Sequence, residues 1–169
     1  MIAPNKKPNR EKIIIIINEK ITKGVLLRGY KKEEFQSLNI VKNQDFSGSK
    51  ILDKSGISIS QELGYDLDLK IGDKLNLVFS SFEETLIGSL PKQKTFKISS
   101  FYNSGFNDFD KNIAFINIED LENQLNLTPD SRFLEIYFKD PTDINKLKKD
   151  LIKFFPNDLI YTWSDLNKP

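Results

Sequence analysis

Cysteine and histidine are both absent from the 169 residues of this chain. Without them there is no disulfide, no thiolate nucleophile, no Cys/His zinc site and no Ser-His-Asp triad. A surplus of one charge sign is missing too, because 25 Lys+Arg stand against 24 Asp+Glu, for a formal net charge of +1. Such a balance provides no long-range field to gather nucleic acid. We therefore expect no nucleic-acid partner, and most familiar catalytic mechanisms are excluded.

A phosphate-binding loop and a membrane-length apolar run are also lacking. The stretch Gly88-Ser89-Leu90-Pro91-Lys92 has no second glycine where the nucleotide-binding motif needs one, and it carries a proline. The longest apolar run, Ile13–Ile17, is far shorter than the roughly 18 residues of a membrane helix. We expect a chain that neither binds nor hydrolyses ATP, that needs no cofactor and that is not itself an enzyme.

The sequence does contain a series of short segments with the residue patterns of strands and helices. The β-branched run Ile13–Ile17 predicts a strand buried on both faces. Ser60 is placed to cap a short helix that begins at Gln61. Further strands are predicted at 22–30, 56–59, 74–79, 95–102, 113–116, 132–138 and 159–162, and helices at 32–38, 119–125 and 143–154.

These segments predict an α+β fold with two lobes in a single domain. A split βαβ-type lobe, lobe A, takes residues 1–45 and 129–169. A β-rich lobe, residues 46–128, is inserted into it and carries a long β-hairpin. The polar stretch at 43–50 and the Pro129-Asp130 pair mark the expected boundaries.

One acidic cluster has the spacing of a calcium loop. Asp108, Asp110, Asn112 and Glu119 stand at its positions 1, 3, 5 and 12. Position 6, which must be glycine for the sharp turn, is Ile113. We expect turn formation by Asx side chains rather than metal binding.

The segment Ser80–Lys94 joins two alternating strands, and with about fifteen residues it is longer than hairpin connections usually are. Its apolar residues, Phe82, Leu86, Ile87, Leu90 and Pro91, suit a binding surface. The alternative is a flap that folds back over the sheet.

Several stretches, taken in order, resemble one family. They are GVLLRG (24–29), ISQEL (59–63), LKIGDKL (69–75), TLIGSLPKQK (85–94), SGFNDFD (104–110) and AFINIEDL (114–121), followed by Trp163. This set is similar to the periplasmic domain of Lol-type lipoprotein-releasing ABC transporter permeases, the LolC/LolE family.

The resemblance implies a domain on the periplasmic face of the bacterial inner membrane, excised from between the first two of four membrane helices. Its partners would be a soluble lipoprotein chaperone, the lipoprotein substrate, a second permease subunit and cytoplasmic ATPase subunits. In that family a long hairpin, the hook, docks on the chaperone above a polar pad. The resemblance assigns the hook to Ser80–Lys94, with its tip at Leu86-Ile87-Gly88 and the pad at Gln93 and Lys94. The expected partner-binding residues are Phe82, Leu86, Ile87, Gly88, Leu90, Pro91, Gln93 and Lys94.

The function expected is docking and force transmission, which couples ATP-driven motion to lipoprotein release. Two alternatives stay open. One is the related periplasmic domain of an efflux or cell-division ABC permease, with a different protein partner. The other is a hydrolase that uses two carboxylates, Asp108 with Asp110 or Glu83 with Glu84, which would require a cleft that pushes their pKa values apart.

Overall fold

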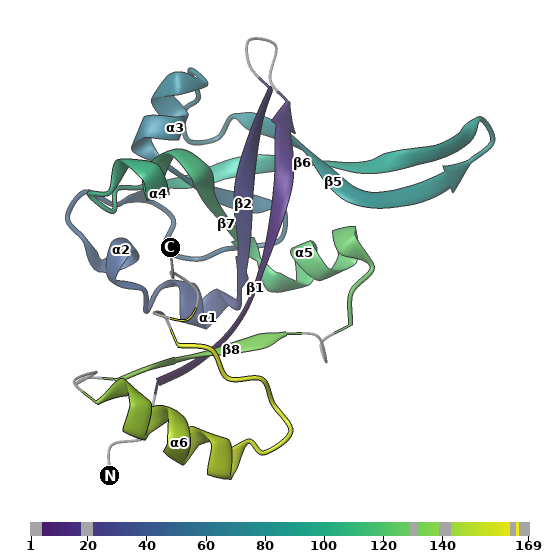
Figure 1. Cartoon of the computed structure of the whole chain (residues 1–169). Coiled ribbons are helices and arrows are strands. Elements are labelled where there is room, and N and C mark those ends of the chain that lie inside the picture. The colour runs from purple at the N-terminus through teal and green to yellow at the C-terminus, as the bar shows by residue number, and fades with distance from the viewer. Residues whose placement is uncertain (1–4, 18–21, 129–131, 139–142, 163–164, 166–169) are drawn as a thin grey trace. The chain divides into compact units, whose positions relative to one another are not determined.

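The computed structural model describes residues 5–17, 22–128, 132–138, 143–162 and 165, without the side chains of 5–11, 133 and 137. The chain forms two compact units, Lys6–Glu135 and the combination of Met1–Asn5 with Ile136–Pro169. The predicted lobes, 1–45 with 129–169 and 46–128, remain a prediction. Strands and helices alternate in the order β1 (Asn5–Ile17), β2 (Thr22–Tyr30), α1 (Lys32–Phe35), α2 (Asn39–Lys42), β3 (Ser47–Gly48), β4 (Gly56–Ser60), α3 (Gln61–Asp66), β5 (Lys74–Thr85), β6 (Gly88–Tyr102), α4 (Asn107–Asn112), β7 (Ile113–Asn117), α5 (Ile118–Leu125), β8 (Phe133–Tyr137) and α6 (Ile144–Phe154) (Figure 1).

A mixed sheet organises the larger unit. Its strand order is β2-β7-β4-β6-β5-β1-β8, and β3 pairs with β6. Strand β1 also pairs with β2, so six strands form a closed circuit. Strands β2 and β7 run parallel, as do β4 and β6, whereas β5 and β6 are antiparallel. The expectation of a mixed fold of helices and strands is confirmed.

Two apolar clusters lie within this unit. The first fills the inside of the strand circuit and includes Ile14, Leu77, Phe96 and the helix residues Leu63 and Leu121. The second gathers aromatic side chains near α1 and α2, where Phe115 lies 5.1 Å from Tyr102 and 5.7 Å from Phe35, measured between ring centroids. The first parts of β5 and the last parts of β6 thus belong to the core, whereas no residue of 80–94 is in either cluster, and this part of the β5–β6 hairpin extends beyond the core (Figure 1).

The prediction that Ile13–Ile17 is buried on both faces is wrong. Ile14 and Ile16 are buried, but Ile13, Ile15 and Ile17 are 71%, 44% and 45% exposed. Successive side chains of a strand point to opposite faces, and only the inner face of β1 meets the core. The residues of its outer face do not take part in either apolar cluster.

Two other predicted elements differ. The helix predicted at 32–38 ends already at Phe35, and a separate short helix, α2, begins at Asn39 after Leu38 takes an extended conformation. The strand predicted at 159–162 is absent from that described segment. There, the Thr162 amide donates to an Asp165 carboxylate oxygen at 2.9 Å, and Leu159 and Tyr161 are exposed. The described residues 159–162 thus form no strand, and the C-terminal βαβ unit is not formed by the described residues.

The remaining elements follow their local signals. The Ser60 hydroxyl oxygen accepts from the Leu63 amide at 3.0 Å, which confirms the predicted helix cap. Asp143 caps α6 in the same way through Lys146. The Pro129-Asp130 boundary and Trp163 lie outside the described residues. None of the described helices has the length and apolar character needed to cross a membrane.

Candidate functional site

The hook is a continuation of two core strands rather than a loop. Pairing of β5 with β6 runs from Lys74 opposite Lys97 to Thr85 opposite Gly88, with an irregularity between Val78 and Phe82. The prediction of a connection of about fifteen residues is therefore wrong, because only Leu86 and Ile87 lie between the two strands. Pairing resumes at Phe82 and continues to the tip, which gives a projecting two-stranded ribbon (Figure 1).

The tip is a tight turn that presents apolar side chains to solvent. The Thr85 hydroxyl donates to the Gly88 carbonyl oxygen at 2.6 Å, and Gly88 adopts φ +120°, a conformation that side chains disfavour. Leu86 and Ile87 are 108% and 86% exposed. A flap folded over the sheet would bury both residues, so this arrangement contradicts the flap interpretation.

The other apolar hook residues lie lower on the ribbon. Phe82 is opposite Pro91, and Leu90 is opposite Glu83. Phe82 and Leu90 are 57% and 43% exposed. Cross-strand partners lie on the same face of a sheet, so Phe82 and Pro91 share one face of the ribbon while Leu90 and Glu83 share the other.

The two residues assigned to the pad have different environments. Gln93 is exposed and pairs with Val78 across the strands. Lys94 places its Nζ 2.6 Å from an oxygen of Asp120, a carboxylate that is 4% exposed. The other Asp120 oxygen accepts from the Ser55 amide at 2.6 Å. The ammonium of Lys94 is thus occupied by an internal ion pair, and it also lies 5.1 Å from the centre of the Phe96 ring.

Helix α5 braces the base of the hook at further points. The Ser81 hydroxyl donates to the Gln124 carbonyl oxygen. The Lys92 ammonium donates to the Asn126 side-chain oxygen at 2.6 Å and to the Asn123 carbonyl oxygen at 3.3 Å. The sequence analysis missed this brace, because nothing in the separate residues links 81–94 to a helix some thirty positions later.

Asp120 and its helix are themselves held in place. The Asn117 side-chain oxygen accepts from the Glu119 amide at 2.9 Å and caps the start of α5. Buried Glu122 accepts two hydrogen bonds from Arg132, at 2.6 and 2.7 Å. The carboxylate beside the guanidinium raises the pKa of Arg132, so the pair remains ionised. The hook therefore rests on a helix with fixed ends.

The acidic candidates form no catalytic pair. Asp110 lies in α4, is buried, and accepts from the Ser104 amide at 3.1 and 3.2 Å. Asp108 is exposed on the same helix, and Glu83 and Glu84 are exposed on the hook. Asp110 thus has the backbone-binding role expected of an Asx side chain. The described residues contain no group of three or more acidic side chains that could hold a metal ion.

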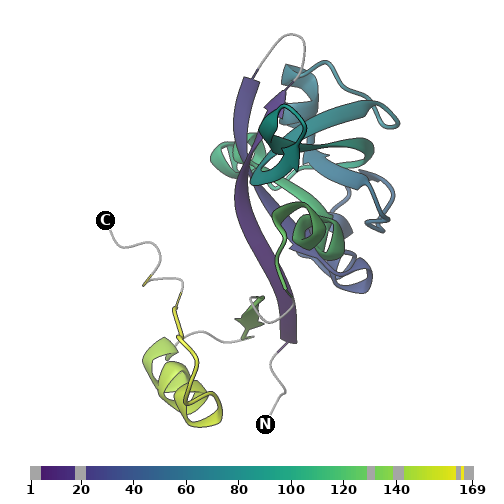
Figure 2. The same ribbon diagram turned by 90° about the vertical axis from the view of Figure 1, so that its right-hand side faces the viewer.

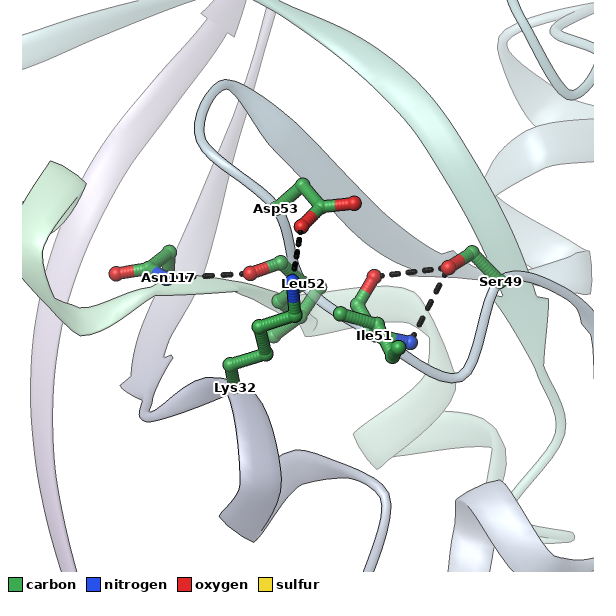
Figure 3. Close-up of polar contacts among 6 residues, drawn as sticks. All are labelled: Lys32, Ser49, Ile51, Leu52, Asp53 and Asn117. Atoms are coloured by element: carbon green, nitrogen blue, oxygen red, sulfur yellow. Dashed lines mark hydrogen bonds and ion pairs between the residues drawn. The ribbon is translucent and has the colours of Figure 1, made fainter.

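A polar pocket of about 620 Å³ lies elsewhere in the larger unit. Figure 3 shows part of its wall, where the Lys32 ammonium is 2.8 Å from an Asp53 oxygen and the Asn117 side-chain amide donates to the Leu52 carbonyl oxygen at 3.1 Å. Cations and carboxylates alternate around it, among them Lys31, Glu119 and Arg132. None of the predicted partner-binding residues lines this pocket.

Comparison with known proteins finds similar sequences and a similar structure. No protein-family model matches the chain. Two curated proteins, the lipoprotein-releasing system transmembrane protein LolC from Xylella fastidiosa strains Temecula1 and 9a5c, are each 26% identical over 115 residues. The match covers 60% of this chain and 28% of each relative, so the chain spans less than a third of their length.

A solved structure shares the fold. The periplasmic region of MacB from Actinobacillus actinomycetemcomitans aligns with a TM-score of 0.54 at 11% identity, over 89% of this chain and 64% of that one. The similarity to the two LolC proteins confirms the resemblance to Lol-type permeases, and the match to the periplasmic region of MacB shows a shared fold.

Proposed function

We propose that this chain is the periplasmic docking and force-transmitting module of a lipoprotein-releasing ABC transporter. The hook binds a soluble lipoprotein chaperone, and the module couples ATP-driven motion of the transporter to lipoprotein release from the inner membrane. The second permease subunit, the ATPase subunits and the lipoprotein substrate are partners of the whole transporter. The similarity to LolC supports this role, and the exposure of the apolar side chains at the hook tip is the main observation behind it.

The tip has the properties that a docking element requires. Leu86 and Ile87 are open to solvent, yet they sit on a ribbon braced at its base by Asp120 and Gln124. A braced element loses little conformational freedom on binding, which lowers the entropic cost of association. Exposed apolar residues at the tip also gain free energy when a partner removes them from water.

A second candidate is the periplasmic domain of an efflux or cell-division ABC permease that binds another protein. The structural similarity to the periplasmic region of MacB favours it. Both candidates share the fold, and they differ in the partner that the hook receives. A direct binding measurement with a purified lipoprotein chaperone distinguishes them.

The decisive variant is Ile87→Asp. Burial of a side chain of that size contributes roughly 1.5–3 kcal/mol, and each 1.4 kcal/mol is about tenfold in affinity. The aspartate also places an unpaired charge in the contact. We expect chaperone affinity to fall about a hundredfold or more in a calorimetric titration.

Stability and a matched variant complete this test. Ile87 makes few contacts with its own chain, so the free energy of unfolding should change by less than about 0.5 kcal/mol. Ile71→Asp introduces the same change at another exposed isoleucine, outside the hook, and should leave affinity unchanged. Equal affinity of wild type and Ile87→Asp would refute docking through the hook.

A further inference from the structure

Helix α5 carries two buried carboxylates that are bound from opposite sides. Asp120 accepts from the Lys94 ammonium at the base of the hook, at 2.6 Å. Glu122 accepts from the Arg132 guanidinium at 2.6 and 2.7 Å. Residues two positions apart on a helix are separated by about 200° around its axis. The two ion pairs therefore lie on opposite sides of α5, one toward the hook and one toward Arg132.

These ion pairs complement the apolar face of α5. Ile118 and Leu121 pack so closely over Gly29 of β2 that a Cβ added there would lie 3.0 Å from the Ile118 Cα. Apolar contact is non-directional, whereas an arginine–carboxylate pair with two bonds fixes orientation as well as distance. The pair of Arg132 with Glu122 therefore sets how the helix is turned on the sheet.

The hook is connected to α5 by polar contacts. Ser81, Lys92 and Lys94 all donate to α5 or to the residue that ends it. Two views at right angles show α5 directly below the hook (Figure 1, Figure 2). Because no residue of 80–94 belongs to either apolar cluster, these contacts and the strands themselves set the direction in which the ribbon points.

Arg132 also lies in the segment through which the chain leaves the larger unit. It directly precedes β8, and this strand passes from the larger unit into the smaller one after Glu135. Glu135 accepts from the Tyr30 hydroxyl of β2 at 3.3 Å and lies 4.0 Å from the Arg28 guanidinium. One short segment thus contacts the helix below the hook and continues into the second unit.

We infer that Arg132 is a positioning residue that makes the direction of the hook depend on β8. Displacement of β8 moves the Arg132 guanidinium, its pair with Glu122 shifts α5, and the polar contacts of α5 shift the hook. Coupling between distant sites is carried by contiguous ion pairs and rigid elements of this kind. The inference rests on the proposed function and gives its force transmission a route through named residues.

Spin labels measure the direction of the hook, and the cysteine-free chain leaves no other labelling site. Lys42→Cys on α2 and Ile87→Cys at the tip place the two labels at exposed positions. Double electron–electron resonance gives the distribution of their separation. We expect Arg132→Met to widen this distribution about twofold, because the base of the hook is no longer fixed. Lys111→Met, which removes an ion pair with Glu62 elsewhere in the larger unit, should retain the wild-type width.

A double-variant cycle tests the link to β8. Glu135→Gln removes the charge that holds β8 beside Tyr30 and Arg28. It should change the mean separation of the labels by about 1–2 Å, the size of helix shifts in switching proteins. The same change should have no effect in the Arg132→Met background, because the link to α5 is already broken. An equal change in both backgrounds, or no change in either, overturns the inference.

Arg132→Lys decides the question if Arg132→Met does not fold. Lysine keeps the charge but loses the two-bond geometry of the guanidinium, so the distribution should still widen. A wild-type distribution in folded Arg132→Lys overturns the inference.

Hydrogen exchange separates positioning from a general loss of stability. In Arg132→Met, amides of α5 and of 80–94 should exchange about tenfold faster, which corresponds to about 1.4 kcal/mol of local stability. Exchange in β4 should stay at the wild-type rate. Equally faster exchange in β4 would mean that Arg132 only stabilises the fold, and would overturn the inference.

The outcomes also separate this inference from the proposed function, because the spin-label and exchange measurements need no partner. Wild-type chaperone affinity in Ile87→Asp refutes docking through the hook and leaves the role of Arg132 to the label distances. Wild-type label distances and exchange in the folded Arg132 variants overturn the inference and leave hook docking in place.

Discussion

Lys94 is held by an internal ion pair with Asp120, which changes the role expected of this residue. Its ammonium lies 2.6 Å from a carboxylate that is almost wholly buried. Removing one partner of a buried pair leaves an uncompensated charge and costs about 3–5 kcal/mol when both partners are buried. Lys94 is 24% exposed and Asp120 keeps its bond from Ser55, so the cost here is smaller.

We therefore predict that Lys94→Met lowers the free energy of unfolding by about 2 kcal/mol. Lys92→Met, which removes an exposed contact to Asn126, should cost less than about 1 kcal/mol. Urea denaturation of both variants measures the difference. Equal stability of Lys94→Met and wild type would show that the pair contributes nothing and that Lys94 is free for a partner.

Three buried serines provide a second test at this scale. The Ser60 hydroxyl accepts from the Leu63 amide and donates to the Asp110 carbonyl oxygen, whereas the hydroxyls of Ser58 and Ser100 have no hydrogen-bond partner among the described residues. Ser60→Ala should destabilise the fold by about 1–2 kcal/mol. Ser58→Ala should be neutral or stabilising, because it removes an unpaired buried hydroxyl. Thermal melts compare the two, and an equal loss in both would contradict this difference.

Tyr102 is expected to lower the stability of the fold at high pH. Burial raises the pKa of its hydroxyl far above the usual value near 10, and the hydroxyl donates to the Ile113 carbonyl oxygen at 2.7 Å. A raised pKa in the folded state gives stability that is fully present below pH 10 and is lost as the pH rises beyond it.

Tyrosinate absorbance from Tyr102 should therefore appear only together with unfolding. The difference in absorbance between wild type and Tyr102→Phe isolates this residue during an alkaline titration, and circular dichroism follows the fold. Ionisation of Tyr102 in a still-folded chain would contradict its enclosed position.

Among the elements, the hook depends on one glycine at its turn. Gly88 has φ +120°, and a side chain there is strained even though nothing lies within 4 Å of an added Cβ. Gly88→Val should loosen the pairing of Thr85 with residue 88 and leave the core intact. Gly24→Val is the control, since Gly24 has equal space and no such φ.

Hydrogen exchange measures this effect. We expect at least tenfold faster exchange across 83–90 in Gly88→Val, with unchanged exchange in β7. Unchanged exchange throughout the hook would mean that the turn is not what holds the ribbon together.

The alternation of apolar residues and the capping residues predicted the helices and strands that pack against the core. Strands such as β2 and β7 and the Ser60 cap were predictable because alternation and capping depend on residues that are close in the sequence. The length of β5 and β6 was not, because beyond Phe79 the ribbon has no core against which apolar residues would alternate. The prediction for Ile13–Ile17 was wrong for a related reason. Five isoleucines in a row do not show which face of the strand is exposed.

At the scale of the whole molecule, the family resemblance identified the hook, and the structure identified the contacts that brace it. The sequence order of 85–94 identified an apolar tip, which the exposure of Leu86 and Ile87 matches. The contacts from Ser81, Lys92 and Lys94 to α5 are long-range and need the folded chain. The docking role itself remains a proposal about a partner outside this chain.

Hydrogen exchange of the wild-type chain, with and without the purified lipoprotein chaperone, tests that role most directly. Docking through the hook predicts that amide exchange across 83–90 slows at least tenfold on adding the chaperone, while β7 and α4 are unchanged. Unchanged exchange across 83–90 at a saturating chaperone concentration, with slowing at another surface such as the pocket around Lys32 and Asp53, would contradict it.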